Sequence, residues 1–574
     1  MKRISRLTGV ILLFFLSLVL LGCDLNNQLP KTSQAFNKFI KTYDFSEVEN
    51  DLDLPEKIDD VEIEYYSTNT TVLTHNGKIF RSNRTETVIL YLTFLYKEDK
   101  LVESVKVTIM KIEEEPNPEP KPEPEPEPEP EPKPEPEPVF DKPFKPTDME
   151  HLQDKLMSED VLFGLPSEDT VKALIIPIDF VDYRFPKSDL LDLEKAFFGT
   201  EADTGWESVK TYYSKSSYGK LNFTGTITDV YSSNKTASYY TNAYNNDEDA
   251  DYYLIKEALE YFDDEIDYSE YDTNNDGYID ALYFIYSTPV DYGDYAYESS
   301  DLWWAYVYQY FTDYEEYYDG VEANYYFWAG SDFMYEAFTY TDYVDYNIKI
   351  NASTYIHETG HMLGLDDYYD YDDAIGPDGG LGGADMMDYT VGDHSSFSKI
   401  MLNWTTPYIA DHGSMEIKIK PFESSGDVIL VTNKWNNTYF DEYFLIDYYT
   451  PTGLNQGHKG FNGLFSSSGI RIYHVNSVID YSVGSPQNVD GYFSVFSYNN
   501  SDTKNNLISF VEADENNSIR TKGITSNTDL FQAGQIFGET VHRDYRLHNN
   551  SPLNFTVKIV SITPTEATIQ INFK

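Results

Sequence analysis

A proline repeat divides this chain of 574 residues into separate parts. From Pro116 to Pro138 every second residue is proline, and most of the residues between are glutamate. Such a segment cannot build a core, because proline and the repulsion between like charges hold it extended. At about 3.1 Å per residue it would reach roughly 70 Å. We therefore expect residues 113–139 to be a linker, or a stalk, between folded parts.

The N-terminus has the order of features found in a bacterial targeting segment. Three basic residues among the first six precede an apolar run from Val10 to Leu21. The run ends in Leu20-Leu21-Gly22-Cys23, which resembles a lipobox, and Cys23 is the only cysteine of the chain. We predict a lipoprotein signal peptide at residues 1–22, lipid (palmitate) on Cys23, and localisation on the extracellular face of the bacterial cell membrane. An uncleaved membrane anchor is the alternative.

The residues between this segment and the proline repeat predict a tether and a small β module. Residues 23–44 are expected to be a polar tether. Val61–Tyr65 and Val105–Ile109 alternate in polarity as half-buried strands do, and Asn76-Gly77 predicts a turn. The pattern resembles a bacterial immunoglobulin-like domain, expected over residues 45–112. We interpret it as a spacer, with carbohydrate or partner binding as the alternative.

One helical motif carries the chemistry of the chain. His357-Glu358-x-x-His361 places two imidazoles one helical turn apart, where both can reach one metal ion. Zinc in catalytic sites takes three protein ligands and keeps a fourth position for water. Gly364 allows a sharp turn after the helix, which can bring Asp367 back as the third ligand. Glu358 follows the first ligand and is the expected general base.

A second motif follows the helix and supports a family resemblance. Residues 385–389, Asp-Met-Met-Asp-Tyr, fit the methionine turn x-x-Met-x-Tyr that metzincin proteases carry beneath their zinc. With the helix motif and the stretches 172–180, 208–221 and 385–404, the chain resembles the immune inhibitor A-type metalloproteases. These are bacterial secreted or surface zinc endopeptidases. The resemblance covers roughly residues 165–574.

The resemblance implies a fold and a set of site residues. The fold class would be multidomain: an α+β metzincin-like catalytic domain at residues 140–408 and a C-terminal β-sandwich at 409–574, besides the N-terminal module. The implied residues are His357, His361 and Asp367 as zinc ligands, Glu358 as base, Met387 as the structural floor, and Tyr389 as a hydrogen-bond donor to the oxyanion.

Most metzincins use a third histidine where this chain has Asp367, which leaves Asp366 as an alternative ligand. A distant glutamate, as in thermolysin-like proteases, is a further alternative. No glutamate occurs between Glu358 and Glu416, and Glu416 lies in a β-like stretch, which argues against it.

Apolar runs predict the elements around the motif. In the catalytic part we expect strands at 173–180, 221–226 and 281–286, and helices at 190–198, 208–214, 251–262 and 397–402. Beyond Trp404 the pattern is β, with strands at 428–431, 443–446, 469–473 and 567–572. His394 is expected to be exposed or hydrogen-bonded, and His474 to be a core or edge residue rather than a ligand.

An acidic loop before the strand at 281–286 predicts calcium binding. Oxygen ligands at alternate positions, with Gly277 sixth, match the start of an EF-hand loop, although position twelve is Tyr283 instead of glutamate. The candidate ligands are Asp272, Asn274, Asp276, Tyr278 and Asp280. An ordinary Asn/Asp-rich turn is the alternative. A weaker candidate cluster consists of Asp366, Asp370 and Asp373.

The net charge of −55 argues against nucleic acid as a partner and against binding to anionic membrane surfaces. The sequence therefore predicts a monomeric, surface-anchored zinc endopeptidase, with structural calcium, that cleaves extracellular proteins or peptides and contacts the membrane only through its lipid. The rival is a catalytically silent adhesin or binding lipoprotein on a metalloprotease scaffold. The intact His357, Glu358, His361 and Tyr389 argue against that rival.

Overall fold

The computed structural model divides into two compact units, Met1–Lys133 and Pro134–Lys574. The structure describes residues 30–111 and 142–574 except for gaps at 44, 46–47, 49, 56, 68–71, 75, 80, 82–84, 98, 159–164, 245–249, 290–300, 310–316, 324, 336–348, 373, 378, 457–464, 480–486, 490–491, 540 and 542–544. Cys23 and the predicted signal peptide lie outside these residues. Within the described ranges, no helix has both the length and the apolar character needed to cross a bilayer.

The first unit is a four-stranded antiparallel sheet with one helix on it. Its elements are α2 (Lys31–Thr42), β1 (Lys57–Ile58), β2 (Val61–Ser67), β3 (Glu86–Tyr96) and β4 (Asp99–Ile109), with the strands in sequence order. Ala35 and Phe39 lie one turn apart on α2 and are buried, and the Phe39 ring contacts that of Phe94 on β3. The tether predicted over residues 23–44 is therefore wrong for 31–42, because this apolar face turns the segment into a core helix.

The second unit begins with a largely parallel sheet. Its strands are β5 (Asp169–Asp179), β6 (Leu221–Ile227), β7 (Tyr231–Ser232), β8 (Leu282–Tyr286), β9 (Tyr306–Gln309) and β12 (Tyr325–Gly330). The order is β6-β5-β8-β12-β9, with β7 also pairing with β5, and only β9 runs antiparallel to its neighbour. The predicted strands at 173–180 and 281–286 are β5 and β8. Both are buried on their two faces, which explains their continuous apolar runs.

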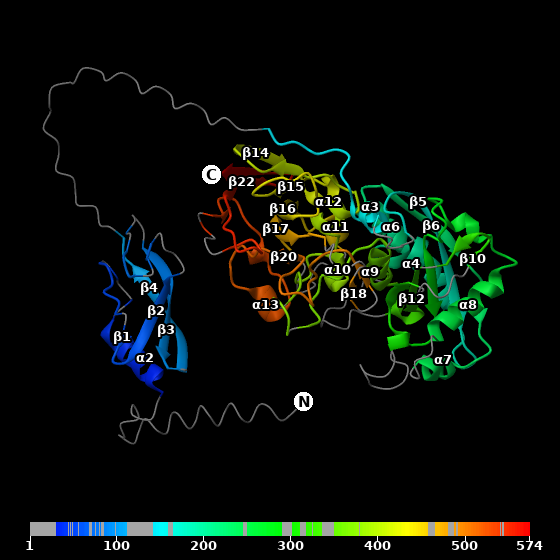
Figure 1. Cartoon of the computed structure of the whole chain (residues 1–574), viewed down its shortest axis with the longest axis horizontal. Helices are drawn as coiled ribbons and strands as arrows, with labels where there is room; N and C mark the ends of the chain where they lie inside the picture. Colours follow the sequence, from blue (N-terminus) through cyan, green and yellow to red (C-terminus); the bar gives the residue numbers. More distant parts are fainter. Residues whose placement is uncertain are drawn as a thin grey trace, which may run out of the picture. The chain divides into compact units, whose positions relative to one another are not determined.

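Helices cover both faces of this sheet and create two cores. They are α3 (Leu152–Ser158), α4 (Lys187–Phe198), α5 (Glu201–Thr204), α6 (Val209–Ser216), α7 (Ala237–Tyr244), α8 (Ala250–Phe262) and α9 (Ser353–Met362). Ala173 and Ile175 of β5 share one core with α4, α6 and α9, while Leu174 and Ile176 share the other with α7 and α8. The predicted metal-binding helix α9 therefore lies on one defined face of the sheet (Figure 1).

The remainder of the second unit is β-rich. One sheet has the order β13 (Tyr408–Ala410), β15 (Val428–Val431), β16 (Glu442–Tyr449), β17 (Gly469–Asn476) and β20 (Ile508–Phe510). The other has the order β14 (Ser414–Ile419), β23 (Glu566–Phe573), β22 (Phe555–Thr563) and β21 (Ile536–Gly538). Short elements complete the unit: β10 (Tyr317–Tyr318), β11 (Val321–Glu322), α10 (Met386–Tyr389), α11 (Ser396–Met401), α12 (Phe422–Ser425), β18 (Gln487–Val489), β19 (Tyr492–Ser494) and α13 (Ser518–Lys522).

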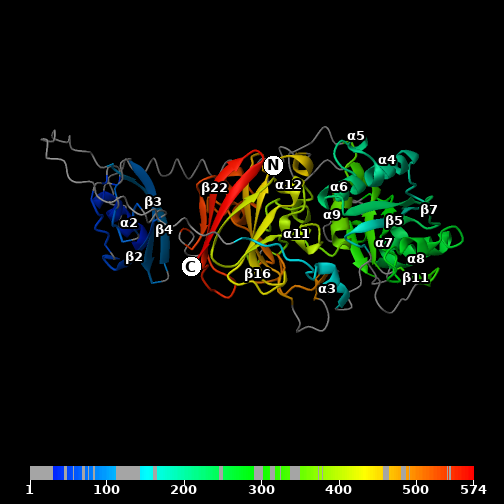
Figure 2. The same ribbon diagram turned by 90° about the horizontal axis from the view of Figure 1, so that it is seen from above.

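The first of these sheets is buried on both faces. On β16, Phe444 and Ile446 face the second sheet, whereas Tyr443 and Leu445 join the core that contains α9. Figure 2 shows β16 and β22 on one side of α11 and the α9 region on the other. The boundary predicted at residues 408/409 is therefore not a break in packing, because one core continues across it.

A buried ion pair links β16 to β17 at this shared core. Arg471 Nε lies 2.7 Å from Asp447 Oδ1, and both side chains are almost fully buried. The Arg471 guanidinium also lies over the rings of Tyr449 and Tyr473. If one partner were removed, water could therefore not easily solvate the charge that remains.

Replacing Arg471 by Met should lower the free energy of unfolding by about 3–5 kcal/mol, because it leaves the Asp447 carboxylate buried without its cation. Urea unfolding followed by tryptophan fluorescence measures this, since all six tryptophans lie in the second unit. The matched control is Lys418→Met at the exposed pair with Glu566, where a much smaller change is expected because solvent screens that pair. Equal losses in the two variants would contradict the prediction.

Candidate metal centre

Helix α9 presents two histidines from one buried face. His357 and His361 are 5% and 1% exposed, and their ring centroids lie 4.9 Å apart. The helix is held against the sheet by a hydrogen bond from the Tyr355 hydroxyl to the Gly330 carbonyl, at 2.8 Å, and by a contact between the Tyr283 and Thr359 hydroxyls, at 3.1 Å. The sheet thus fixes the face that the two imidazoles share.

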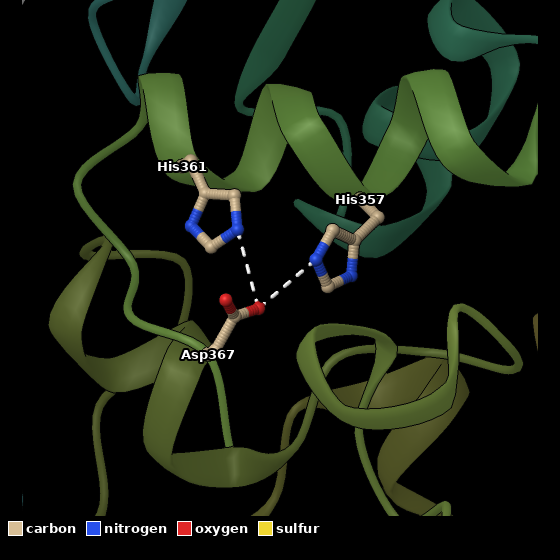
Figure 3. Close-up of side chains that lie close together, drawn as sticks. All are labelled: His357, His361 and Asp367. Carbon is tan, nitrogen blue, oxygen red and sulfur yellow. Dashed lines mark ion pairs between the residues drawn. The ribbon is translucent and has the colours of Figure 1, made fainter. Parts of the chain in front are cut away.

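A glycine turn brings the third residue to these imidazoles. Gly364 has φ +95°, and its N–H donates to the His361 carbonyl at 2.8 Å, so the chain reverses directly after α9. Asp367 Oδ1 then lies 3.0 Å from His357 Nε2 and 3.2 Å from His361 Nε2 (Figure 3). The three residues form a cluster of potential metal ligands that does not include the neighbouring Asp366.

The other ring nitrogen of each histidine is bound to a backbone carbonyl. His357 Nδ1 lies 3.0 Å from the Met386 oxygen, and His361 Nδ1 lies 2.8 Å from the Leu365 oxygen. A carbonyl can only accept, so each Nδ1 carries the proton and each Nε2 is directed at Asp367. This tautomer is the one in which Nε2 can bind a metal.

Burial and the charges of neighbouring groups act in opposite directions on the pKa values in this cluster. Burial lowers the pKa of His357, but the hydrogen bond and charge of Asp367 outweigh burial and raise that pKa to about 9. For Asp367 burial acts to raise the pKa, and the two imidazoles reverse this and hold it well below its usual range. The carboxylate is therefore ionised in this site.

Glu358 lies beside the cluster with its carboxylate shielded from water. It is 5% exposed, and burial raises its pKa. Its Oε2 atom has no hydrogen-bond partner among the described residues. A buried carboxylate oxygen without a partner is costly, which indicates that a group from outside the protein, such as water, is accommodated there.

The predicted methionine turn is the short helix α10, which lies directly against α9. A Cβ atom on Gly360 would come within 2.3 Å of Met387 Sδ, so the two elements approach as closely as glycine permits. Asp385 caps α10 by accepting from the Met387 N–H at 2.8 Å. His394 is buried and its Nδ1 lies 3.3 Å from Asp385 Oδ1, which confirms the hydrogen-bonded role expected for it.

A cavity of about 320 Å³ lies beside these residues. It is lined by Tyr369, Asp370, Gly379, Asp388, Tyr389 and the segment 519–523, which includes most of α13. A Cβ atom on Gly523 would lie 3.0 Å from the Tyr389 hydroxyl, so Tyr389 faces this wall. The cavity therefore joins the methionine turn to the β-rich region of the chain.

Tyr369 is a site residue that the sequence reasoning missed. Its ring lies over that of His357, with centroids 6.4 Å apart and planes inclined by 28°. Burial raises its pKa, and the charges of Asp367 and Glu358 and a hydrogen bond to Asp367 raise it further. Its position two residues after Asp367 was the available signal, but a chain with 51 tyrosines gave no reason to single it out.

The predicted calcium loop brings three carboxylates together before β8. Ligand atoms of Asp272, Asp276 and Asp280 lie within 4.8 Å of one another. Asp280 is fully buried, and its Oδ1 has no hydrogen-bond partner in the described part of the chain. Burial raises the pKa of Asp280 to about 7, in spite of hydrogen bonds from Thr273.

The remaining loop positions differ in their environment. Asn274 donates to Asp276 Oδ2 at 2.8 Å, and the Tyr278 N–H donates to Asp276 Oδ1 at 2.9 Å. Tyr283, at position twelve, lies in the core with its hydroxyl against Thr359 and is no ligand. In the weaker cluster Asp370 accepts from backbone N–H groups, and Asp373 lies outside the described residues.

Comparison with known proteins finds a family match for the part of the chain that contains α9. Residues 167–387 match the family model for the catalytic domain of immune inhibitor A peptidase M6. No curated protein matches the chain. The family match confirms the resemblance to immune inhibitor A-type metalloproteases over this segment, which ends at Met387 and contains the clustered His357, His361 and Asp367. It indicates a metallopeptidase, a hydrolase that acts on proteins or peptides.

Gly364→Ala should destabilise the second unit by about 1–3 kcal/mol, because alanine is strained at φ +95° and its Cβ would lie 2.7 Å from the buried Leu156 Cδ1. Urea unfolding measures the change. Gly219→Ala is the matched control, since Gly219 has φ +81° and no atom within 4 Å of an added Cβ. If the control loses as much stability as Gly364→Ala, the turn is not packed as the structure shows.

Proposed function

We propose that this chain is a zinc endopeptidase whose zinc is held by His357, His361 and Asp367. The observation that carries the proposal is the convergence of both Nε2 atoms on Asp367 Oδ1, at 3.0 and 3.2 Å, while both Nδ1 atoms are bound to carbonyls. Two imidazoles and one carboxylate suit zinc in a catalytic site. The two carbonyls bound to the Nδ1 atoms are the outer hydrogen-bond partners that metal-binding histidines usually have.

Glu358 is the proposed general base. When bound, zinc supplies Lewis acidity that polarises the scissile carbonyl and lowers the pKa of a water molecule. The free Oε2 of Glu358 accepts the proton of the attacking water, and Glu358 then delivers it to the leaving amine.

Two tyrosines supply the remaining groups. Tyr369 positions Asp367 through its hydroxyl and covers one face of the His357 ring. Tyr389 lines the cavity, and we propose that its hydroxyl donates to the oxyanion of the tetrahedral intermediate. The cavity between these tyrosines and α13 has room for one substrate side chain. Its wall carries Arg520 and Lys522 as well as Asp370 and Asp388, which suits a polar side chain.

The other regions are proposed to place and stabilise this enzyme. Cys23 carries the lipid that anchors it outside the bacterial cell membrane, and residues 113–139 hold it away from that surface. The first unit is a spacer, and the two C-terminal sheets form a β-sandwich around their shared core. Calcium at Asp272, Asp276 and Asp280, with Asn274 and the Tyr278 carbonyl, fixes the loop that leads into β8. The silent adhesin is the rival, and a zymogram with and without a zinc chelator separates the two.

Glu358→Gln should leave zinc content unchanged and lower kcat by about 10²–10⁴-fold, because the amide fills the same space but cannot take the proton. Zinc is counted by mass spectrometry of the purified full chain, and kcat is measured on casein. Asp367→Ala is the companion variant and should lose both zinc and activity. Near-normal turnover by Glu358→Gln would eliminate Glu358 as the base.

Calcium should raise the thermal stability of the chain, and Asp280→Asn should abolish most of that gain. At 100 times the dissociation constant, binding contributes about 2.7 kcal/mol. Calorimetry with calcium or with a calcium-selective chelator measures the difference. Asp263→Asn, an exposed aspartate outside the loop, is the control. An identical calcium response in Asp280→Asn and wild type would rule out this loop as the site.

A further inference from the structure

A second group of two histidines and a carboxylate lies in the β-rich region, away from α9. Glu442 begins β16, His474 lies on β17, and His548 lies in the segment before β22. Their potential ligand atoms all lie within 4.8 Å of one another. The strand register pairs Phe444 with His474, which places Glu442 two residues further along the same face.

The contacts within this group match those at the candidate catalytic centre. His474 Nε2 lies 2.9 Å from Glu442 Oε1, against 3.0 and 3.2 Å for the corresponding nitrogen–oxygen pairs at Asp367. The rings of His474 and His548 have centroids 5.1 Å apart, against 4.9 Å for His357 and His361. Ligands of one tetrahedral zinc ion lie roughly 3.3 Å apart, given metal–ligand distances of about 2.0–2.1 Å.

The surroundings hold both imidazoles in place. The His548 backbone N–H donates to Glu442 Oε1 at 2.6 Å, which fixes the carboxylate and the position of the His548 ring. His474 Nδ1 lies 3.3 Å from the Tyr545 hydroxyl, and its ring stacks on Phe444 with centroids 4.5 Å apart. His548 Nδ1 lies 2.8 Å from Asn476 Nδ2, which donates to it. Each ring therefore has a polar group at Nδ1, where metal-binding histidines have their outer hydrogen-bond partner.

We propose that Glu442, His474 and His548 bind a second zinc ion. Imidazole nitrogens select a metal such as zinc over calcium, which takes oxygen ligands. The site is poorly accessible to water, since His474 is 4% exposed and the Glu442 side chain 12%. For the amide of Asn476 to accept from His548 Nδ1–H in the bound state, its oxygen must face that ring. A half-turn of the amide provides this in exchange for the 3.4 Å contact between the Val478 N–H and Asn476 Oδ1.

The proposed ion would join the two C-terminal sheets. Glu442 and His474 belong to the sheet that contains β16 and β17, while His548 precedes β22 of the other sheet. The carboxylate of this cluster, Glu442, is itself a proposed ligand and accepts from the His548 backbone N–H, so the cluster has no further carboxylate to act as a base. We therefore assign the site a structural role and expect zinc here to raise stability without changing the rate of peptide hydrolysis.

The test counts zinc in the full chain after equilibration with micromolar zinc and desalting. Wild type should hold two zinc ions, Asp367→Ala one, and Asp367→Ala combined with His548→Ala none. In the Asp367→Ala background, zinc should raise Tm, and adding His548→Ala should remove that shift. Glu442→Gln is the second variant, since it keeps an acceptor for the His548 N–H and still weakens zinc binding. His412→Ala, at an exposed histidine, is the matched control and should change nothing.

Three outcomes overturn the second site. The first is that Asp367→Ala holds no zinc. The second is that Asp367→Ala keeps its zinc ion after His548→Ala is added. The third is that adding His412→Ala removes this ion as completely as adding His548→Ala does. None of these depends on proteolysis. A failed protease proposal shows instead as equal zinc content in wild type and Asp367→Ala.

Discussion

The geometry of the candidate metal centre depends on two hydrogen bonds from imidazole Nδ1 atoms to backbone carbonyls. They fix the His357 and His361 rings with Nε2 directed inward, and the acceptors are the carbonyls of Met386 and Leu365. One acceptor lies in the methionine turn and the other in the turn after α9. Both turns must therefore be held rigidly against the helix for the nitrogen atoms to keep their direction.

Buried polar contacts supply that rigidity behind the methionine turn. Asp385 accepts from Ser395 N–H at 2.7 Å and from the Ser398 hydroxyl at 2.8 Å, besides capping α10. Further on, the fully buried Lys399 pairs with Asp393 at 2.6 Å. Buried charges of this kind contribute little net stability, because desolvation offsets their attraction. These contacts instead restrict how α10 and α11 can be arranged.

Local spacing made most of the candidate site predictable from the sequence. The i,i+4 histidines, Gly364 and the methionine turn are all encoded within about 35 residues, and a helix or a turn places them without distant information. The buried strands β5 and β8 were equally clear, because both faces of a parallel sheet demand apolar residues. The helix at 31–42 was missed although Ala35, Phe36, Phe39 and Ile40 recur at helical spacing, because the polar residues around them were interpreted as a tether.

What the sequence could not show depends on contacts between distant segments. Glu442 and His548 are 106 residues apart. The pairing of β16 with β17 and the course of the segment before β22 bring them together. His474 was interpreted as a core or edge residue because no neighbouring histidine or cysteine marked it as a ligand. The same limit hid the shared core across residue 408, where alternate side chains of β16 belong to different cores.

The two histidine clusters also differ in features that bear on the roles proposed for them. At the Asp367 cluster a second carboxylate, Glu358, lies beside the ligands with one oxygen free, and a cavity approaches through Tyr369. At the other cluster the Glu442 carboxylate is itself the proposed ligand, and it accepts from the His548 N–H. Similar ligands suit the same metal at both places, and the first cluster adds a carboxylate and a cavity beside the ligands. The proposed catalysis therefore needs the Glu358 carboxylate beside the metal ligands as well as the ligands themselves.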